Sequence, residues 1–363
     1  MVTIGINMGF GNLYEDLSDE EMYRGEIDIT VLADKLGYDN VFAVEHHFTD
    51  YSMCPDNFVF LAHVAGLTKN IKLGTGAVIV PWNNPLRVAE KALMLDTITG
   101  GRFMLGVGRG LSRKEYVPFN IPLDETRDRF DEAVPMIFEA IETGVIEGHG
   151  PYYPQPRTEL RPAPRESFEG RKFVVAGSPS SMLGAAKLKT GILSFITRPV
   201  AEMVADFTAY RKAYEEQHGE LAPPITIAVN MFCHEDQAFA EERNEEYRTR
   251  FFYSNVEHYE MAGDHFATTK GYERYAESAK RIQEAGLEAS ADKFAQTGLW
   301  GTPERILGKI EEIRDHMGEF ALSLQPAFGG MPYAEAAHSL ELFAREVMPV
   351  ARTMQGTRAS VLV

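Results

Sequence analysis

The stretch that decides the fold reads IKLGTGAVIVPWNNPLRVAEKALMLDTITGGRFMLGVGRG (71–110). It opens with an apolar, β-branched run, continues with a helical pattern that stops at Gly100, and returns to an apolar run at 102–110. Two buried strands joined by a helix form the βαβ unit of a parallel sheet. The stretch therefore predicts parallel β-structure covered by helices.

The same alternation extends in both directions from this unit. Amphipathic helical patterns separate further apolar runs, which predict strands at 3–10, 40–47, 172–177, 192–196, 225–234 and 320–327. Eight strands, each followed by a helix, predict an α/β fold that closes into a (β/α)8 (TIM) barrel. A barrel of this kind can use a chain of 363 residues as one domain, so we expect a single domain over 1–363.

One segment, 250–300, does not fit the repeat. It is polar and aromatic and contains glycine. Long connections of this kind are usually lids or disordered segments. We therefore predict a mobile loop or insertion before the last βα units, with 257–297 as the part that closes over an active site and excludes water. A loop rich in Pro and Arg, 149–170, separates the first four strands from the fifth.

The composition excludes several classes of protein. The net charge is −17, from 53 acidic and 36 basic residues, which argues against nucleic-acid binding. The two cysteines, Cys54 and Cys233, fit no CxxC pattern, and so few in a chain of this length suggest a reducing compartment. The N-terminal residues lack the pattern of a secretory signal, and no apolar stretch approaches the roughly 20 residues that span a bilayer. We expect a cytoplasmic protein that binds no membrane.

Candidate catalytic residues stand where the second predicted strand ends. Glu45, His46 and His47 lie there, and catalytic groups of such barrels lie at the C-terminal ends of the strands. A lone histidine in this position is more often a hydrogen-bonded structural residue, but histidine also suits proton transfer near neutral pH. Neighbouring side chains of a strand point to opposite faces, so the two histidines are expected to have different roles.

A candidate anion site is distributed over the next strand ends. Arg109 stands between glycines after the fourth strand, and Arg127 lies near the start of the following helix, where the helix dipole disfavours a cation. Ser178, Ser180 and Ser181 follow the fifth strand. The serines could simply cap a helix, and Arg127 could pair with a neighbouring carboxylate. Together, however, these residues outline a phosphate pocket at a helix N-terminus.

Several segments resemble those of a known family, and they occur in the same order over nearly the whole chain. They are EHHFTD (45–50), GTGAVIVPWNNPLRVAE (74–90), GRFMLGVGRGL (101–111), VVAGSPSS (174–181) and GTPERI (301–306). They resemble bacterial luciferase and its relatives, the two-component flavin-dependent monooxygenases. TTKGY (268–272) is similar to the mobile loop of luciferase.

The resemblance implies roles for individual residues. His46 is at the position of the catalytic general base, and Glu45 is expected beside the flavin ring. Gly76–Ala77 is at the position of a non-prolyl cis peptide under that ring; from the residues alone, these positions could equally reflect close packing in the barrel. The remaining flavin-binding positions, most of them for the phosphate, are Arg109, Leu111, Arg127, Val175, Ser178 and Ser181.

The resemblance also implies an activity and partners. Such an enzyme receives reduced FMN (FMNH2) from a separate flavin reductase, since the chain shows no second nucleotide-binding motif. It uses O2, through a C4a-peroxyflavin, to insert one oxygen atom into a small organic substrate. Members of the family associate through the helices after the second and third strands, so we expect a homodimer.

Four residues differ from the luciferase pattern: Gly108, Ser112, Gly177 and Phe195 stand where luciferase has cysteine, tyrosine, glutamate and tryptophan. They imply a reshaped substrate pocket, so neither light emission nor an aliphatic aldehyde substrate follows from the resemblance.

Three other functions compete with this interpretation. A deazaflavin-dependent oxidoreductase has the same fold, although EHHF favours FMN. A non-catalytic partner subunit would not need His46 and the phosphate-binding positions. A metal-dependent barrel hydrolase would use Glu45, His46, His47 and Asp50 as ligands, but the opposite orientation of adjacent histidines opposes this, and we expect no metal.

Overall fold

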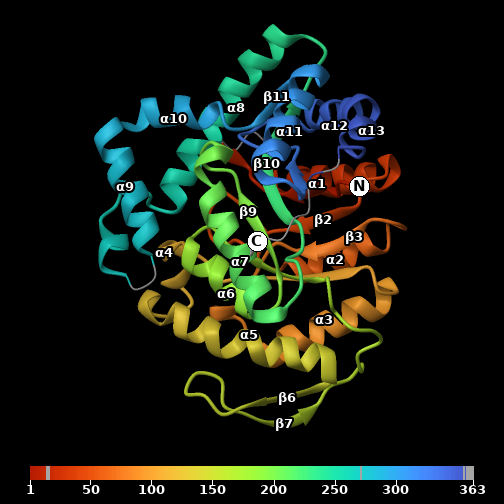
Figure 1. The fold of residues 1–363 in the computed structure, drawn as a ribbon, viewed down its shortest axis with the longest axis vertical. Helices are drawn as coiled ribbons and strands as arrows, with labels where there is room; N and C mark the ends of the chain where they lie inside the picture. Colours follow the sequence, from red (N-terminus) through yellow and green to blue (C-terminus); the bar gives the residue numbers. More distant parts are fainter. Residues whose placement is uncertain (14–16, 270–271, 355, 357–363) are drawn as a thin grey trace.

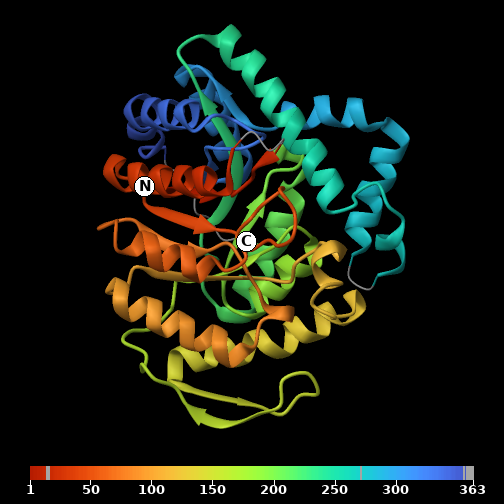
Figure 2. The same cartoon turned by 180° about the vertical axis from the view of Figure 1, so that it is seen from behind.

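A computed structural model of the chain describes residues 1–13, 17–269, 272–354 and 356. Eight strand positions form a closed ring of parallel pairings, which begins with β1 and ends where β12 pairs with β1 again (Figures 1 and 2). The strands are β1 (Ile4–Met8), β2 (Asn40–Ala43), β3 (Lys72–Thr75) continued by β4 (Val78–Ile79), β5 (Phe103–Gly108), β8 (Lys172–Val175), β9 (Gly191–Phe195), β10 (Ile225–Cys233) and β12 (Phe320–Gln325). The predicted (β/α)8 barrel is confirmed.

Helices surround the ring and bury their apolar faces against it. They are α1 (Asp19–Leu36), α2 (Asn57–Ala65), α3 (Pro85–Thr99), α4 (Arg113–Tyr116), α5 (Thr126–Thr143), α6 (Pro179–Lys187), α7 (Val204–His218), α8 (Gln237–His258), α9 (Glu273–Ala285), α10 (Leu287–Ala295), α11 (Pro303–Met317), α12 (Tyr333–Leu342) and α13 (Met348–Ala351). Local sequence fixes their ends. Ser18 and Glu21 form a capping box at the start of α1, and Gly37, with a φ of 82°, ends that helix.

Side chains fill the barrel, so it is a packed core and not a pore. Phe42, Met104, Leu193 and Ala228, from four different strands, form one buried cluster inside the ring. Strand-to-helix contacts form the larger core outside it. Because the interior is closed, a site for small molecules has to lie at the mouth of the barrel, where the strands end.

Two predicted loops contain regular structure. The connection after α5 forms an antiparallel hairpin of β6 (Val145–Gly148) and β7 (Gln155–Glu159), which lies beyond α5 in both views (Figures 1 and 2). The segment 250–300 is mostly helical: it comprises the end of α8, then α9, α10 and β11 (Leu299–Gly301), which pairs with β10. Of TTKGY, Lys270 and Gly271 lie outside the described residues. Within the described ranges, no helix is long and apolar enough to cross a membrane.

Candidate active site

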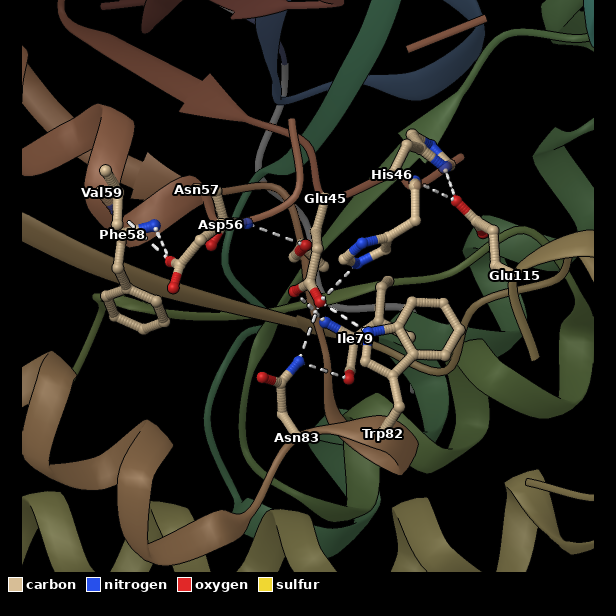
Figure 3. Close-up of polar contacts among 12 residues, drawn as sticks. Glu45, His46, Asp56, Asn57, Phe58, Val59, Ile79, Trp82, Asn83 and Glu115 are labelled. Atoms are coloured by element: carbon tan, nitrogen blue, oxygen red, sulfur yellow. Dashed lines mark hydrogen bonds and ion pairs between the residues drawn. The ribbon is translucent and has the colours of Figure 1, made fainter. Parts of the chain in front are cut away.

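Glu45 lies just past the end of β2 and is almost completely buried. Its Oε2 accepts a hydrogen bond from the backbone N–H of Ile79 at 2.9 Å, and its Oε1 accepts from Trp82 Nε1 at 2.6 Å and from Asn83 Nδ2 at 2.9 Å (Figure 3). His47 Nε2 lies 3.3 Å from the same Oε1. Glu45 therefore ties the end of β2 to the turn that follows β4.

The Gly76–Ala77 peptide bond, between β3 and β4, is cis, as the resemblance predicts. Asn57 holds this turn in place, because its Nδ2 donates to the carbonyl oxygens of Ala43 at 3.2 Å and Ala77 at 3.0 Å. The predicted strand 71–80 is consequently two short strands.

The ends of three strands form an apolar surface beside this turn. A Cβ atom at Gly108 would stand 3.0 Å from the Cβ of Ala77 and 4.0 Å from that of Val175. The ends of β4, β5 and β8 thus approach one another closely, and only glycine at position 108 leaves the surface free of a further side chain. Ala77 and Val175, both predicted flavin contacts, are brought together here.

His46 points toward a carboxylate that the sequence analysis did not identify. His46 Nδ1 lies 2.9 Å from Oε1 of Glu115, which belongs to α4 after β5 (Figure 3). The same oxygen accepts the backbone N–H of His47 at 2.8 Å. The second histidine differs as expected: its ring packs edge-on against Trp82 and Phe119 and bonds to Glu45.

The surroundings of His46 fix which groups carry protons. Burial raises the pKa of Glu115, but the neighbouring imidazoles of His46 and His258 outweigh this and hold that pKa well below its usual range. Burial lowers the pKa of His258, so that ring is neutral at neutral pH. Burial also holds the pKa of Tyr259 well above its usual range. Glu115 is therefore an anion that orients His46 Nδ1–H, and the Tyr259 hydroxyl, 3.3 Å from His46 Nε2, stays protonated.

Aromatic rings enclose His46 on its remaining sides. The Tyr51 ring stacks on His258 with centroids 4.5 Å apart and meets the His46 ring edge-on at 5.3 Å. Only 15% of the His46 side chain is exposed. A proton on this imidazole is therefore largely shielded from bulk water.

The predicted phosphate residues meet at the start of α6. Arg127, in the first turn of α5, donates from Nη2 to Ser180 Oγ at 2.9 Å. Ser178 and Ser181 form a reciprocal capping box at the N-terminus of α6. The serines therefore cap the helix, and Arg127 also lies next to them. The Arg127 cation thus faces a helix N-terminus that carries three hydroxyl groups.

Residues next to α9 cover the same region. The Arg109 guanidinium lies 4.4 Å from the centre of the Tyr272 ring, and the Tyr272 hydroxyl donates to the carbonyl of Gly110 at 3.1 Å. The Tyr275 hydroxyl would stand 3.1 Å from a Cβ at Gly177, beside the serine turn. Leu111 follows in the same connection and is half-buried. The segment 250–300 therefore packs over the phosphate-binding positions.

A set of possible metal ligands also lies here. Ligand atoms of His46, Glu115 and His258 all lie within 4.8 Å of one another. Of the ligands considered from the sequence for a metal-dependent hydrolase, only His46 belongs to this set. His47 bonds to Glu45 instead.

Glu115, Tyr51, His258 and Tyr259 were not predicted from the sequence. Glu115 carried a usable signal, since it is an acidic residue six positions after Arg109 at a strand end. His258 and Tyr259 carried none, because Tyr259 lies 213 residues from His46 and both lie inside the segment predicted as a loop.

Comparison with known proteins decides the family. The sequence profile of the luciferase-like monooxygenases matches residues 2–319. The chain belongs to the luciferase-like monooxygenase family. The alkanal monooxygenase alpha chain of Photobacterium leiognathi is 25% identical over 338 residues, which cover 92% of this chain and 94% of that one. The oxygenase component of the flavin-dependent trigonelline monooxygenase of Acinetobacter baylyi is 21% identical over 348 residues, 92% and 91% of the two chains.

Solved structures of several other enzymes share the fold. The monooxygenase RslO1 of Streptomyces bottropensis matches with a TM-score of 0.72 at 29% identity, over 96% of this chain and 99% of that one. The oxygenating constituent of 3,6-diketocamphane monooxygenase from Pseudomonas putida, solved with FMN, has a TM-score of 0.73 at 20% identity and the same coverage. The coenzyme F420-dependent tetrahydromethanopterin reductase of Methanopyrus kandleri, at 17% identity, has a TM-score of 0.67 over 96% and 99%.

Proposed function

We propose that this family member is the oxygenase component of a two-component flavin-dependent monooxygenase. It takes FMNH2 from a separate reductase and uses O2 to insert one oxygen atom into a small organic substrate. The observation that carries the proposal is the shielded His46–Glu115 pair at the barrel mouth, beside the turn at Gly76–Ala77. The names of the trigonelline oxygenase component and of the FMN complex support it.

The residues present suit FMN. The apolar surface at Ala77, Gly108 and Val175 offers contact to a planar ring. Arg127 and the serine turn offer a cation, hydroxyl groups and a helix N-terminus to a phosphate, with Arg109 and Leu111 adjoining in the connection after β5. Reduced FMN bound here would supply two electrons and activate O2; one oxygen atom enters the substrate and the other leaves as water.

The protein's own part is proton transfer and the exclusion of water. Glu115 holds His46 with Nδ1–H toward the carboxylate, which leaves Nε2 to accept or return a proton. The Tyr259 hydroxyl can donate to that nitrogen when it is neutral. Tyr51, together with His258 and Tyr259 at the start of the 250–300 segment, limits access of water to His46. We propose that 257–297 opens and closes as a lid.

A homodimer is proposed through α2 and α3. These neighbouring helices leave Val59, Met94 and Ile98 exposed by 67%, 58% and 58%. Exposed apolar side chains on neighbouring helices are typical of an interface. We further propose that the chain acts as a single domain in the cytoplasm.

The test is an anaerobic titration with FMNH2, followed by mixing with O2 and analysis of products from a panel of aldehydes, ketones and terpenes. The proposal expects saturable FMNH2 binding and an oxygenated product. A parallel titration with reduced coenzyme F420 separates the deazaflavin alternative, and metal analysis separates a hydrolase. Binding of F420 but not FMNH2, or product formation that requires a metal, would overturn the proposal.

A further inference from the structure

A separate cavity opens beside the His46 cluster. It measures about 180 Å³ and lies between the residues that follow β1 and the connection from β12 to α12. A buried cavity of roughly 150 Å³ can hold benzene, so this one can take a molecule, or part of one, of slightly larger size. Glu26, Tyr51, Phe251, Phe328 and Tyr333 are among the residues that line it.

Glu26 contributes a buried carboxyl group to this cavity. Only 1% of the residue is exposed, and its Oε1 accepts hydrogen bonds from the backbone N–H of Phe10 at 3.2 Å and the hydroxyl of Tyr333 at 3.0 Å. Its Oε2 is buried and has no hydrogen-bond partner in the part of the chain that the structure describes. Leaving such an atom unpaired costs about 1–3 kcal/mol.

The chain makes room for this arrangement. A Cβ at Gly25 would stand 2.2 Å from the ring of Tyr333, so a larger residue there would displace the ring that reaches Glu26. Burial raises the pKa of Glu26 to about 7. The carboxyl group can therefore ionise near neutral pH, and a bound cation would favour the ionised form.

The walls of the cavity suit a cation. Tyr51, Phe251, Phe328 and Tyr333 supply four aromatic rings around one carboxyl group, and no lysine or arginine is among the described residues that line the space. Aromatic rings attract cations through their negative faces, and more strongly where water is excluded. An anionic ligand would instead meet an uncompensated carboxylate.

The cavity also adjoins the catalytic cluster. Tyr51 lines the cavity, and the centroid of its ring lies 5.3 Å from that of the His46 ring. A molecule anchored at Glu26 therefore lies one aromatic ring away from the proposed base.

We propose that this cavity binds the cationic end of the organic substrate, a protonated amine held by the carboxyl group of Glu26 and the four rings. The substrate class is thus a small organic ammonium compound. That the bound cation is the substrate rests on the proposed function. That the cavity binds a cation rests only on the residues that line it.

The test uses benzylammonium as the probe and benzyl alcohol as the neutral probe of the same shape. Calorimetric titration of the full chain, without flavin and at pH 8, should show that benzylammonium binds more tightly. Glu26→Gln should weaken the binding of benzylammonium by about 10-fold or more, the scale of a lost charge-assisted hydrogen bond. The affinity for benzyl alcohol should stay unchanged. Equal binding of both probes to the native chain, an unchanged benzylammonium affinity in the variant, or no binding of benzylammonium would overturn the proposal.

Two further measurements keep the outcome clear. If Glu26→Gln does not fold, Phe328→Leu is the second variant. It removes one aromatic ring from the cavity wall, so it should weaken the binding of benzylammonium more than that of benzyl alcohol. Equal weakening of both affinities would contradict the cation site. An FMNH2 titration of the same sample separates the two proposals. Flavin binding without benzylammonium binding refutes only the cation site, and the reverse refutes only the flavin-dependent function.

Discussion

His46 Nδ1 lies 2.9 Å from Glu115 Oε1, although 69 residues separate them in the chain. The end of β2 and the short helix after β5 bring them together at the mouth of the barrel. The carboxylate fixes one imidazole nitrogen as a donor and leaves the other for chemistry. Glu115 is thus a positioning residue that acts through His46.

Glu115→Gln tests this role. The amide keeps the shape but loses the charge, so product formation should fall by about 10- to 100-fold, below the full contribution of an acid–base group. The affinity for FMNH2 should stay unchanged, because Glu115 acts through His46. Single-turnover rates and an anaerobic FMNH2 titration measure both effects. Glu115→Asp should restore most of the rate, and a normal rate in Glu115→Gln would show that the carboxylate is only structural.

Arg127→Ala tests the phosphate site. Loss of the guanidinium beside Ser180 should weaken FMNH2 binding by about 1–3 kcal/mol, the scale of a charge-assisted hydrogen bond. Arg129→Ala is the matched control, because Arg129 lies in the same helix but pairs with Glu125 at 2.7 Å. Anaerobic titration gives both affinities. Equal affinity of the two variants for FMNH2 would show that Arg127 does not bind the phosphate.

Glu26 makes the stability of the fold depend on pH. Its pKa is raised by burial from 4.5 to about 7, so the folded state favours the protonated carboxyl. The contribution of Glu26 to the free energy of unfolding is fully present below pH 4.5. It is lost as the pH rises through 7, a change of about 3 kcal/mol. Without ligand, Glu26→Gln should therefore gain stability relative to the native chain between pH 5 and pH 8. Urea unfolding at both pH values measures the difference; the same difference at both would refute the raised pKa.

Met94→Glu tests the proposed dimer. A charge placed on the apolar face of α3 should shift the mass in solution from twice 40.6 kDa to 40.6 kDa. Leu183→Glu, which changes a 45% exposed apolar residue on α6, is the control and should remain dimeric. Light scattering at micromolar concentration decides the question. A monomeric native chain would contradict the interface.

The barrel could be predicted from the sequence because each strand and helix carries its own local pattern. The run 102–110 and the helix that ends at Gly100 needed no distant partner to be identified. The hairpin β6–β7 was missed because its prolines are typical of irregular loops. The helices in 250–300 were missed because their polar surfaces hide the apolar stripe.

The candidate site was predictable only in part, for a similar reason. The predicted residues lie at strand ends, where the barrel fold itself brings side chains together. Glu115 and Tyr259 come from connections whose paths are set by packing, so their distances to His46 depend on the whole fold. The cis bond at Gly76–Ala77 followed from the resemblance and not from the residues alone.

The most direct test of the proposed chemistry is a single turnover by His46→Ala with excess FMNH2, O2 and a substrate found in the product screen. Excess reduced flavin removes the reductase from the measured rate. His46→Ala should bind FMNH2 like the native chain and stay folded, while product formation falls by about 10²-fold or more. His47→Gln, the control, changes a ring that packs against Trp82 and Phe119 and should keep most activity once folded. Near-normal product yield from His46→Ala would contradict its assignment as the catalytic base.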